Sequence, residues 1–122
     1  MRAVQVTETG GPEVLVPAEL PDPTTGPGEM LVEVAAVGVN YIDTYQREGR
    51  YPMPLPYVPG LEGAGRVRGL GDGVRDFAVG DRVAWAETLG SDAELICVPR
   101  RQGRAGAGCD LRSRRRQRSC RA

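Results

Sequence analysis

Residues 37–65 read VGVNYIDTYQREGRYPMPLPYVPGLEGAG, and the order of patterns in this stretch decides the fold. NYIDTYQREG has helical spacing, with Asn40 at the expected N-cap and Gly49 at the expected C-terminal end. PMPLPYVPG cannot join the centre of a sheet, because each proline removes a backbone donor. The next segment, LEGAGRVRGLG, is predicted to be a strand whose glycines allow a tight bend or the close approach of another backbone.

Short strand patterns lie on either side of this stretch. MRAVQVTE alternates between apolar and polar residues, and GEMLVEVAAVGVN at 28–40 carries a longer apolar run. GDRVAWA at 80–86 and SDAELICVP at 91–99 have the same character. Short strands at close spacing, few helices and many Gly/Pro turns are typical of small antiparallel β folds. We therefore predict a mainly β fold, a partly open barrel with one short helix.

The formal net charge of zero averages two segments of opposite charge. Residues 1–99 carry seven arginines and fifteen acidic residues, whereas residues 100–122 carry nine arginines and one aspartate. The second segment contains no Val, Ile, Phe, Tyr, Trp or Met, so it cannot bury a useful apolar face. We predict a folded domain over residues 1–99 and a disordered Arg-rich tail over residues 100–122.

Membrane and disulfide patterns are both absent from the sequence. No apolar run approaches the roughly 20 residues that a membrane span needs, and the N-terminus lacks the basic-then-apolar pattern of a signal peptide. The expectation is a soluble, cytoplasmic chain with no membrane partner. The three cysteines, Cys97, Cys109 and Cys120, fit neither a disulfide framework nor a paired metal spacing.

Five motifs follow one another along residues 1–99: GGPEVL, VGVNYIDTYQREGRYP, PGLEGAGRV, VGDRVAW and AELICVP. Together they resemble the N-terminal GroES-like domain of the medium-chain dehydrogenase/reductase superfamily, in particular its zinc-free quinone oxidoreductase (zeta-crystallin-like) branch. The resemblance implies a GroES-like fold, an NADPH cofactor and hydride transfer to a small quinone or enone substrate. Complete members continue into a Rossmann domain, which we expect to be absent because no GxGxxG is followed by an acidic residue about 20 positions on.

The resemblance also bears on metal binding. Zinc-dependent relatives place a Cys in the NYIDTY region and a His in a GHE motif, and both hold the catalytic metal. Here Asn40–Tyr45 contains no Cys, the GHE counterpart reads Gly60-Leu61-Glu62, and the chain has no histidine. A site with neither thiolate nor imidazole lacks the usual ligands for catalytic zinc. We therefore predict a site without zinc or any other metal.

Without zinc, a carbonyl oxygen has to be polarised by hydrogen-bond donors, and a phenol keeps its proton at neutral pH. The resemblance implies that Tyr45 and Tyr51 flank the substrate entrance and that Asn40 orients cofactor or substrate, so these three are the candidate catalytic residues. The candidate cofactor-binding residues, against the nicotinamide end of NADPH, are Tyr41, Ile42, Asp43, Thr44 and Tyr45. Simpler roles stay open: Asn40 as a helix cap, Asp43 as a first-turn acid favoured by the helix dipole, and the tyrosines as rim aromatics.

The Arg-rich tail has two interpretations. Family members continue at this point with a sequence such as ADKAVPVP, and the residues from about Arg100 are compatible with that gene read one nucleotide out of frame. The chain is then a truncated N-terminal fragment of a reductase, inactive alone. Alternatively, the arginines form an arm that binds anionic surfaces nonspecifically, and the chain is a noncatalytic fragment or binding module. We expect no specific nucleic acid, and the resemblance implies a homodimer for complete members.

Overall fold

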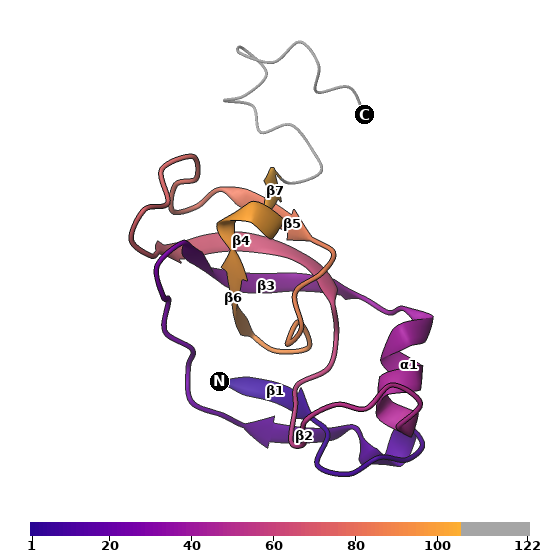
Figure 1. Ribbon diagram of the computed structural model, residues 1–122. Coiled ribbons are helices and arrows are strands. Elements are labelled where there is room, and N and C mark those ends of the chain that lie inside the picture. Colours follow the sequence, from indigo (N-terminus) through magenta and orange to yellow (C-terminus); the bar gives the residue numbers. More distant parts are fainter. Residues whose placement is uncertain (106–122) are drawn as a thin grey trace.

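The computed structural model describes residues 1–105, which form two antiparallel sheets and one α-helix (Figure 1). β1 pairs with β2 in a small sheet, and the larger sheet has the strand order β6-β3-β4-β5-β7. The strands do not close into a barrel, so the prediction of a mainly β, partly open fold with one short helix is confirmed. The elements are β1 (Arg2–Gln5), η1 (Pro12–Val14), β2 (Val16–Glu19), β3 (Glu29–Gly38), α1 (Tyr41–Glu48), β4 (Glu62–Leu70), β5 (Arg82–Trp85), β6 (Leu95–Pro99), η2 (Arg100–Gln102) and β7 (Arg104–Ala105).

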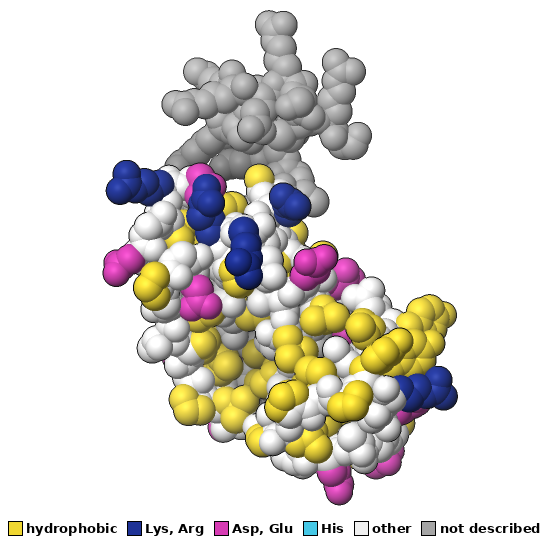
Figure 2. All heavy atoms as spheres, in the orientation of Figure 1, with side chains coloured by type: hydrophobic (Ala, Val, Ile, Leu, Met, Phe, Trp, Pro, Cys, Tyr) yellow, Lys and Arg dark blue, Asp and Glu magenta, His cyan; other side chains and the backbone are white. Residues whose placement is uncertain are grey.

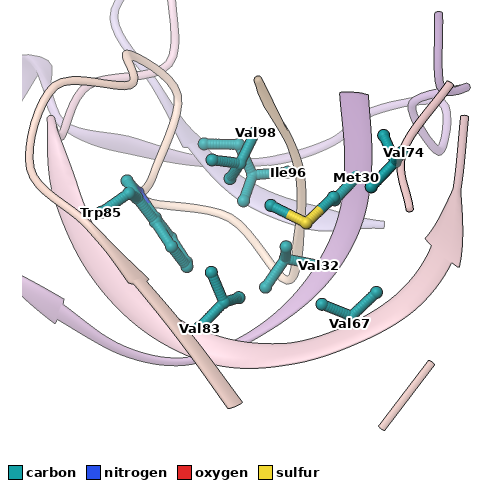
Figure 3. Packing of buried hydrophobic residues seen from close by; sticks show 8 residues of the cluster. All are labelled: Met30, Val32, Val67, Val74, Val83, Trp85, Ile96 and Val98. Carbon is teal, nitrogen blue, oxygen red and sulfur yellow. The ribbon is translucent and has the colours of Figure 1, made fainter. Parts of the chain in front are cut away.

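The main core lies on the inner face of the larger sheet. Val32 in β3 is paired in register with Val67 in β4 on one side and with Ile96 in β6 on the other. Residues paired directly across neighbouring strands point to the same face of a sheet, and all three of these side chains are buried on that face. Figure 3 shows how the cluster fills the space between the strands, with eight buried members: Met30, Val32, Val67, Val74, Val83, Trp85, Ile96 and Val98.

Two glycines in β4 lie where another group approaches the strand closely. A Cβ atom on Gly63 would come 2.7 Å from Cζ2 of Trp85, and one on Gly65 would overlap the carbonyl oxygen of Glu33. The register between β3 and β4 also shifts between Val34 and Ala36. The prediction that the glycines of this strand allow close approach of another backbone is therefore confirmed at Gly65.

A second, smaller core joins the N-terminal sheet to the proline-rich segment. Val6 and Tyr57 exchange two backbone hydrogen bonds, with N···O distances of 2.9 and 3.0 Å, in an isolated β-bridge. Their side chains are buried together with Val14, and Met53 packs against them. The proline-rich segment thus contributes one bridge rather than a strand, as its missing backbone donors predict.

Helix α1 follows directly on the end of β3 and lies at one side of the molecule (Figure 1). It has eight residues and is the one α-helix within residues 1–105. No helix in this part of the chain is long and apolar enough to cross a membrane.

Regular structure extends past Pro99, where the sequence predicted a tail without structure. Arg100–Gln102 form η2 and Arg104–Ala105 form β7, which pairs with β5. Polar contacts hold them: the backbone N–H of Arg100 donates to the oxygen of Gly28 at 2.8 Å, and the hydroxyl of Thr88 donates to the side-chain oxygen of Gln102 at 2.5 Å. Apolar burial is the signal used to predict structure here, so the sequence missed these residues. The remainder of the predicted tail, residues 106–122, lies outside the described residues.

Candidate functional site

Helix α1 begins and ends at residues that define its position. Asn40 has an extended backbone, and its N–H donates to Oδ2 of Asp43 at 2.9 Å, which holds the first turn. At the other end Gly49 adopts the left-handed conformation with φ of 88°, and its N–H donates to the carbonyl oxygens of Tyr45 and Gln46. A side chain disfavours this conformation, so glycine ends the helix at this point. The predictions of a cap at Asn40 and a stop at Gly49 are confirmed.

The turn after the helix brings two predicted site residues together. The backbone N–H groups of Arg50 and Tyr51 donate to the carbonyl oxygen of Tyr45 at 2.9 and 3.3 Å. The rings of Tyr45 and Tyr51 lie 5.9 Å apart, centroid to centroid, with an interplanar angle of 56°. The guanidinium carbon of Arg50 is 5.3 Å from the centroid of the Tyr45 ring. Two phenol groups are therefore positioned side by side at the C-terminal end of α1, within the range of favourable aromatic and cation–π contacts.

Apolar side chains are exposed along the helix and on both sides of it. Val39 and Tyr41 are 84% and 85% exposed, and Tyr51 is 54% exposed. Hydrophobic side chains gather over this part of the surface in Figure 2. We call this surface the α1 edge, made of Val37, Val39, Tyr41, Ile42, Tyr51 and Leu55, all of which are exposed. Contiguous apolar surface of this kind is a common mark of a binding face.

The other predicted site residues point in different directions. Tyr41 and Ile42 lie on the exposed side of the helix, whereas Asp43, Thr44 and Tyr45 are half-buried. One carboxylate oxygen of Asp43 accepts from the N–H of the cap residue Asn40, and the other is buried without a hydrogen-bond partner among the described residues. The structure thus brings Tyr45 and Tyr51 together, and it places Asp43 as an acid in the first turn of the helix, the simpler alternative considered for it.

Sequence reasoning missed two titratable residues whose pKa responds to the charge of Asp43. Burial raises the pKa of the Tyr57 hydroxyl, the charge of Asp43 raises it further, and the charge of Arg47 opposes the change. Burial also raises the pKa of the Asp92 carboxyl, and the charge of Asp43 adds to the effect. Tyr57 lies in the proline-rich segment and Asp92 in the loop before β6, far apart along the chain. No local pattern could have connected them.

The donor set near the helix does not resemble a catalytic zinc site. Within residues 1–105, no three side chains from His, Cys, Asp and Glu come close enough to hold one ion. Residues 60–62 read Gly-Leu-Glu without a histidine, and the side chain of Glu62 lies over Gly38, where a Cβ atom would overlap it. These residues offer no thiolate or imidazole to a soft metal ion.

The two antiparallel sheets and a single helix within residues 1–105, with Tyr45 on that helix and Tyr51 in the turn after it, are the architecture of a GroES-like domain. Residues 26–113 match the sequence profile of the alcohol dehydrogenase GroES-like domain family, and the chain belongs to this family.

Several proteins similar to this chain are quinone oxidoreductases. The chain is 46% identical over 99 residues to a probable quinone oxidoreductase of Schizosaccharomyces pombe, covering 79% of this chain and 30% of the relative. It is 47% identical over 96 residues to a quinone oxidoreductase of Pseudomonas aeruginosa, covering 77% and 30%. The structure of Escherichia coli quinone oxidoreductase complexed with NADPH superposes with a TM-score of 0.83 at 36% identity, covering 86% of this chain and 33% of that one.

The chain therefore spans about a third of the length of the relatives it matches. The resemblance to the quinone oxidoreductases of the medium-chain dehydrogenase/reductase superfamily, predicted from five motifs, is confirmed by these matches.

Proposed function

We propose that this chain is the N-terminal domain of an NADPH-dependent oxidoreductase that transfers hydride to a small quinone or enone. The observation that carries the proposal is the 46% identity to a quinone oxidoreductase over 99 residues. The bound NADPH of the similar E. coli structure supports the choice of cofactor. NADPH supplies the hydride when it is bound, and the side chains of this domain bind and orient the reactants.

In this proposal the Tyr45–Tyr51 pair acts on the substrate. A phenol keeps its proton at neutral pH, so it can donate a hydrogen bond to the oxygen on which negative charge develops during reduction. Tyr51 is exposed and Tyr45 supports it at a ring distance of 5.9 Å. We assign the direct hydrogen bond to Tyr51 and the placement of its ring to Tyr45. Asn40 then orients the cofactor or substrate at the opposite end of the helix.

The nicotinamide end of the cofactor fits the α1 edge. A flat aromatic ring needs an apolar surface to pack on, and Tyr41 with Ile42 presents one that no described residue covers. Asp43 holds the first turn below this surface through its bond from the N–H of Asn40, and Thr44 is half-buried. The pyrophosphate of the cofactor usually binds at a βαβ unit with parallel strands. Every strand pair within residues 1–105 is antiparallel. We infer that most of the NADPH affinity comes from a further domain and that these 122 residues alone do not turn over.

A chimera tests this function directly. Residues 1–99 of this chain would replace the corresponding domain of E. coli quinone oxidoreductase, and NADPH-dependent quinone reduction would be measured. We expect activity from the chimera and none from the 122-residue chain. Tyr51→Phe should lower kcat by about 10- to 100-fold, because removing one donor to a developing oxyanion has a large cost. Tyr45→Phe should have a smaller effect.

The matched control is Val79→Ser, which changes an exposed residue in the turn before β5. This variant should keep the activity of the unmodified chimera. A chimera that folds and binds NADPH but does not reduce quinones contradicts the proposed function, as does robust turnover by the 122-residue chain.

A further inference from the structure

Four arginines lie together on the outer face of the larger sheet. Val67 in β4 and Val83 in β5 are buried in the main core on the inner face. Successive side chains of a strand alternate between the two faces of a sheet, so Arg66 and Arg82, the residues before them, point outward. Both of these arginines are exposed. We call this surface the arginine face, and it is made of Arg66, Arg68, Arg82 and Arg104.

The strand register sets the spacing of the arginine face. Arg66 and Arg82 are paired directly across β4 and β5, so their Cβ atoms lie about 5 Å apart. Arg104 in β7 is paired with Ala84, which lies two residues after Arg82 and on the same side of β5. The fourth member, Arg68, is two residues from Arg66, about 7 Å along β4. Four positive charges therefore occupy one small area of the sheet.

One acid lies among these arginines. Glu33 in β3 is paired in register with Arg66, and its Oε2 lies 3.7 Å from Nε of Arg68, which places Arg68 on the outer face as well. This contact joins two exposed side chains, so solvent screens it. No ion pair forms at Arg66, Arg82 or Arg104 among residues 1–105. The described residues thus offer a carboxylate to one of the four arginines.

The pairing of Arg66 with Arg82 has a cost for the free domain. Like charges directly opposite each other destabilise a pair of strands. Arg66 is held in this place, because its Nη1 donates to the carbonyl oxygen of Gly80 at 3.1 Å. A guanidinium group has five N–H donors, so most donors of the two side chains remain available to a bound anion. An anion that contacts both side chains removes the repulsion between them.

A phosphate backbone has the chemistry that this surface requires. The planar fork of a guanidinium group forms two parallel hydrogen bonds with a phosphate group. A nucleic-acid duplex carries one negative charge per about 1.7 Å of its axis, so several phosphates lie within reach of an area of this size. The strand positions beside the arginines hold Ala64 and Ala84, which supply no ring for stacking unpaired bases and no long apolar chain for insertion into a membrane. We propose that the arginine face binds the phosphate backbone of a nucleic-acid duplex without reading its sequence.

The arginine face lies apart from the candidate site and next to a further run of positive charge. Most of the arginines visible in Figure 2 lie over the end of the molecule where Figure 1 places β4, β5 and β7, away from α1. Residues 106–122, which follow β7 directly, contain six more arginines. Contacts with phosphates carry no sequence information, so the proposal agrees with the expectation of no specific nucleic acid. None of the four arginines is a candidate site residue, so the proposal goes beyond the proposed function and does not depend on it.

The experiment measures binding of the 122-residue chain to a labelled DNA duplex of arbitrary sequence by fluorescence anisotropy at several salt concentrations. Each phosphate contact contributes about 0.9 to the slope of log affinity against log salt. Arg66→Gln/Arg82→Gln should therefore lower this slope by about 2 and weaken binding by about 10- to 50-fold at about 0.1 M salt. Arg82→Gln alone breaks no ion pair among residues 1–105, and it should lower the slope by about 1. The control is Arg2→Gln/Arg50→Gln, which removes two exposed arginines outside the arginine face and should leave the slope unchanged.

Three results would overturn the proposal. An unchanged slope in Arg66→Gln/Arg82→Gln would assign the binding to the arginines of residues 106–122, which that variant keeps. Equal losses in Arg2→Gln/Arg50→Gln would show an effect of net charge rather than of this surface. Tighter binding of a single strand, or of vesicles of phosphatidylserine and phosphatidylcholine, would identify a different partner. None of these measurements involves NADPH or quinone reduction, so a failure here is distinct from a failure of the proposed function.

Discussion

Replacing Ser91 by alanine should destabilise the domain far more than an ordinary loop substitution. Ser91 is fully buried, its hydroxyl accepts from Nε1 of buried Trp85 at 2.8 Å, and it donates to the carbonyl oxygen of Thr88 at 2.8 Å. Alanine leaves both groups buried without a partner, and each such group costs about 1–3 kcal/mol. Allowing for partial relaxation, we expect a loss of about 2–4 kcal/mol in the free energy of unfolding. Urea titration followed by far-UV circular dichroism measures this loss.

A double-mutant cycle identifies the cause of the effect. Trp85→Phe keeps an aromatic ring in the core but removes the indole N–H, so Ser91→Ala should cost about 1–2 kcal/mol less in that background. Thr24→Ala, at an exposed position, is the control and should stay within about 0.5 kcal/mol of the parent. Equal costs of Ser91→Ala in both backgrounds, or a cost below about 0.5 kcal/mol in the parent, would refute the reasoning.

Three further predictions concern the helix end and two titrating groups. Gly49→Ala should lower the free energy of unfolding by about 1–2 kcal/mol in urea titrations, because the backbone φ of Gly49 is 88° and the added Cβ atom would lie 3.3 Å from Cγ2 of Thr9. An unchanged free energy of unfolding would contradict this prediction. Burial raises the pKa of the Cys97 thiol, with a smaller effect from the charge of Glu29. In a Cys109→Ser/Cys120→Ser background, Cys97 should therefore react with a disulfide reagent at pH 8 several-fold more slowly than free cysteine. A faster reaction would be inconsistent with the structure. Hydrogen bonds from the backbone and side chain of Arg2 lower the pKa of Glu94. The contribution of Glu94 to folding stability is therefore present above the ordinary pKa of glutamate and is lost as the pH falls through the lower pKa of the folded state. Glu94→Gln should lower the thermal midpoint of unfolding at pH 7 but not at pH 3.

Local patterns were sufficient for the secondary structure near the candidate site. The cap at Asn40, the stop at Gly49 and the strand that begins at Glu62 all follow from residues close to them in the chain. Their physical causes are local too: a first-turn carboxylate for orphan N–H groups, a left-handed backbone that suits glycine, and prolines that cannot join a ladder. The proximity of Tyr45 and Tyr51 also follows from a short turn whose N–H groups return to the carbonyl oxygen of Tyr45.

Contacts between distant segments had no such signal. The structure of residues 100–105 depends on hydrogen bonds from Arg100 to Gly28 and from Thr88 to Gln102, and polar pairs of this kind leave no periodicity in a sequence. The prediction that structure stops at Pro99 was therefore incorrect for Arg100–Gln102 and Arg104–Ala105. Apolar periodicity in a sequence indicates which side chains are buried, and it does not predict segments that are held mainly by backbone and polar contacts.

The sequence by itself determined the class of domain, the helix and its ends, and the placement of two tyrosines at one end of that helix, because each depends on neighbours within a few residues. Only the tertiary structure decided that Asp43, Gln46 and Tyr57 each bury a polar atom without a hydrogen-bond partner among the described residues. It also decided that Asp92 and Tyr57 lie along the same edge of the N-terminal strand. Two bonds from β1 bring Tyr57 and Asp92 together across 35 residues of chain. The pKa of a carboxyl group depends on its distance from other charges and from water, and both are set by folding rather than by residue type.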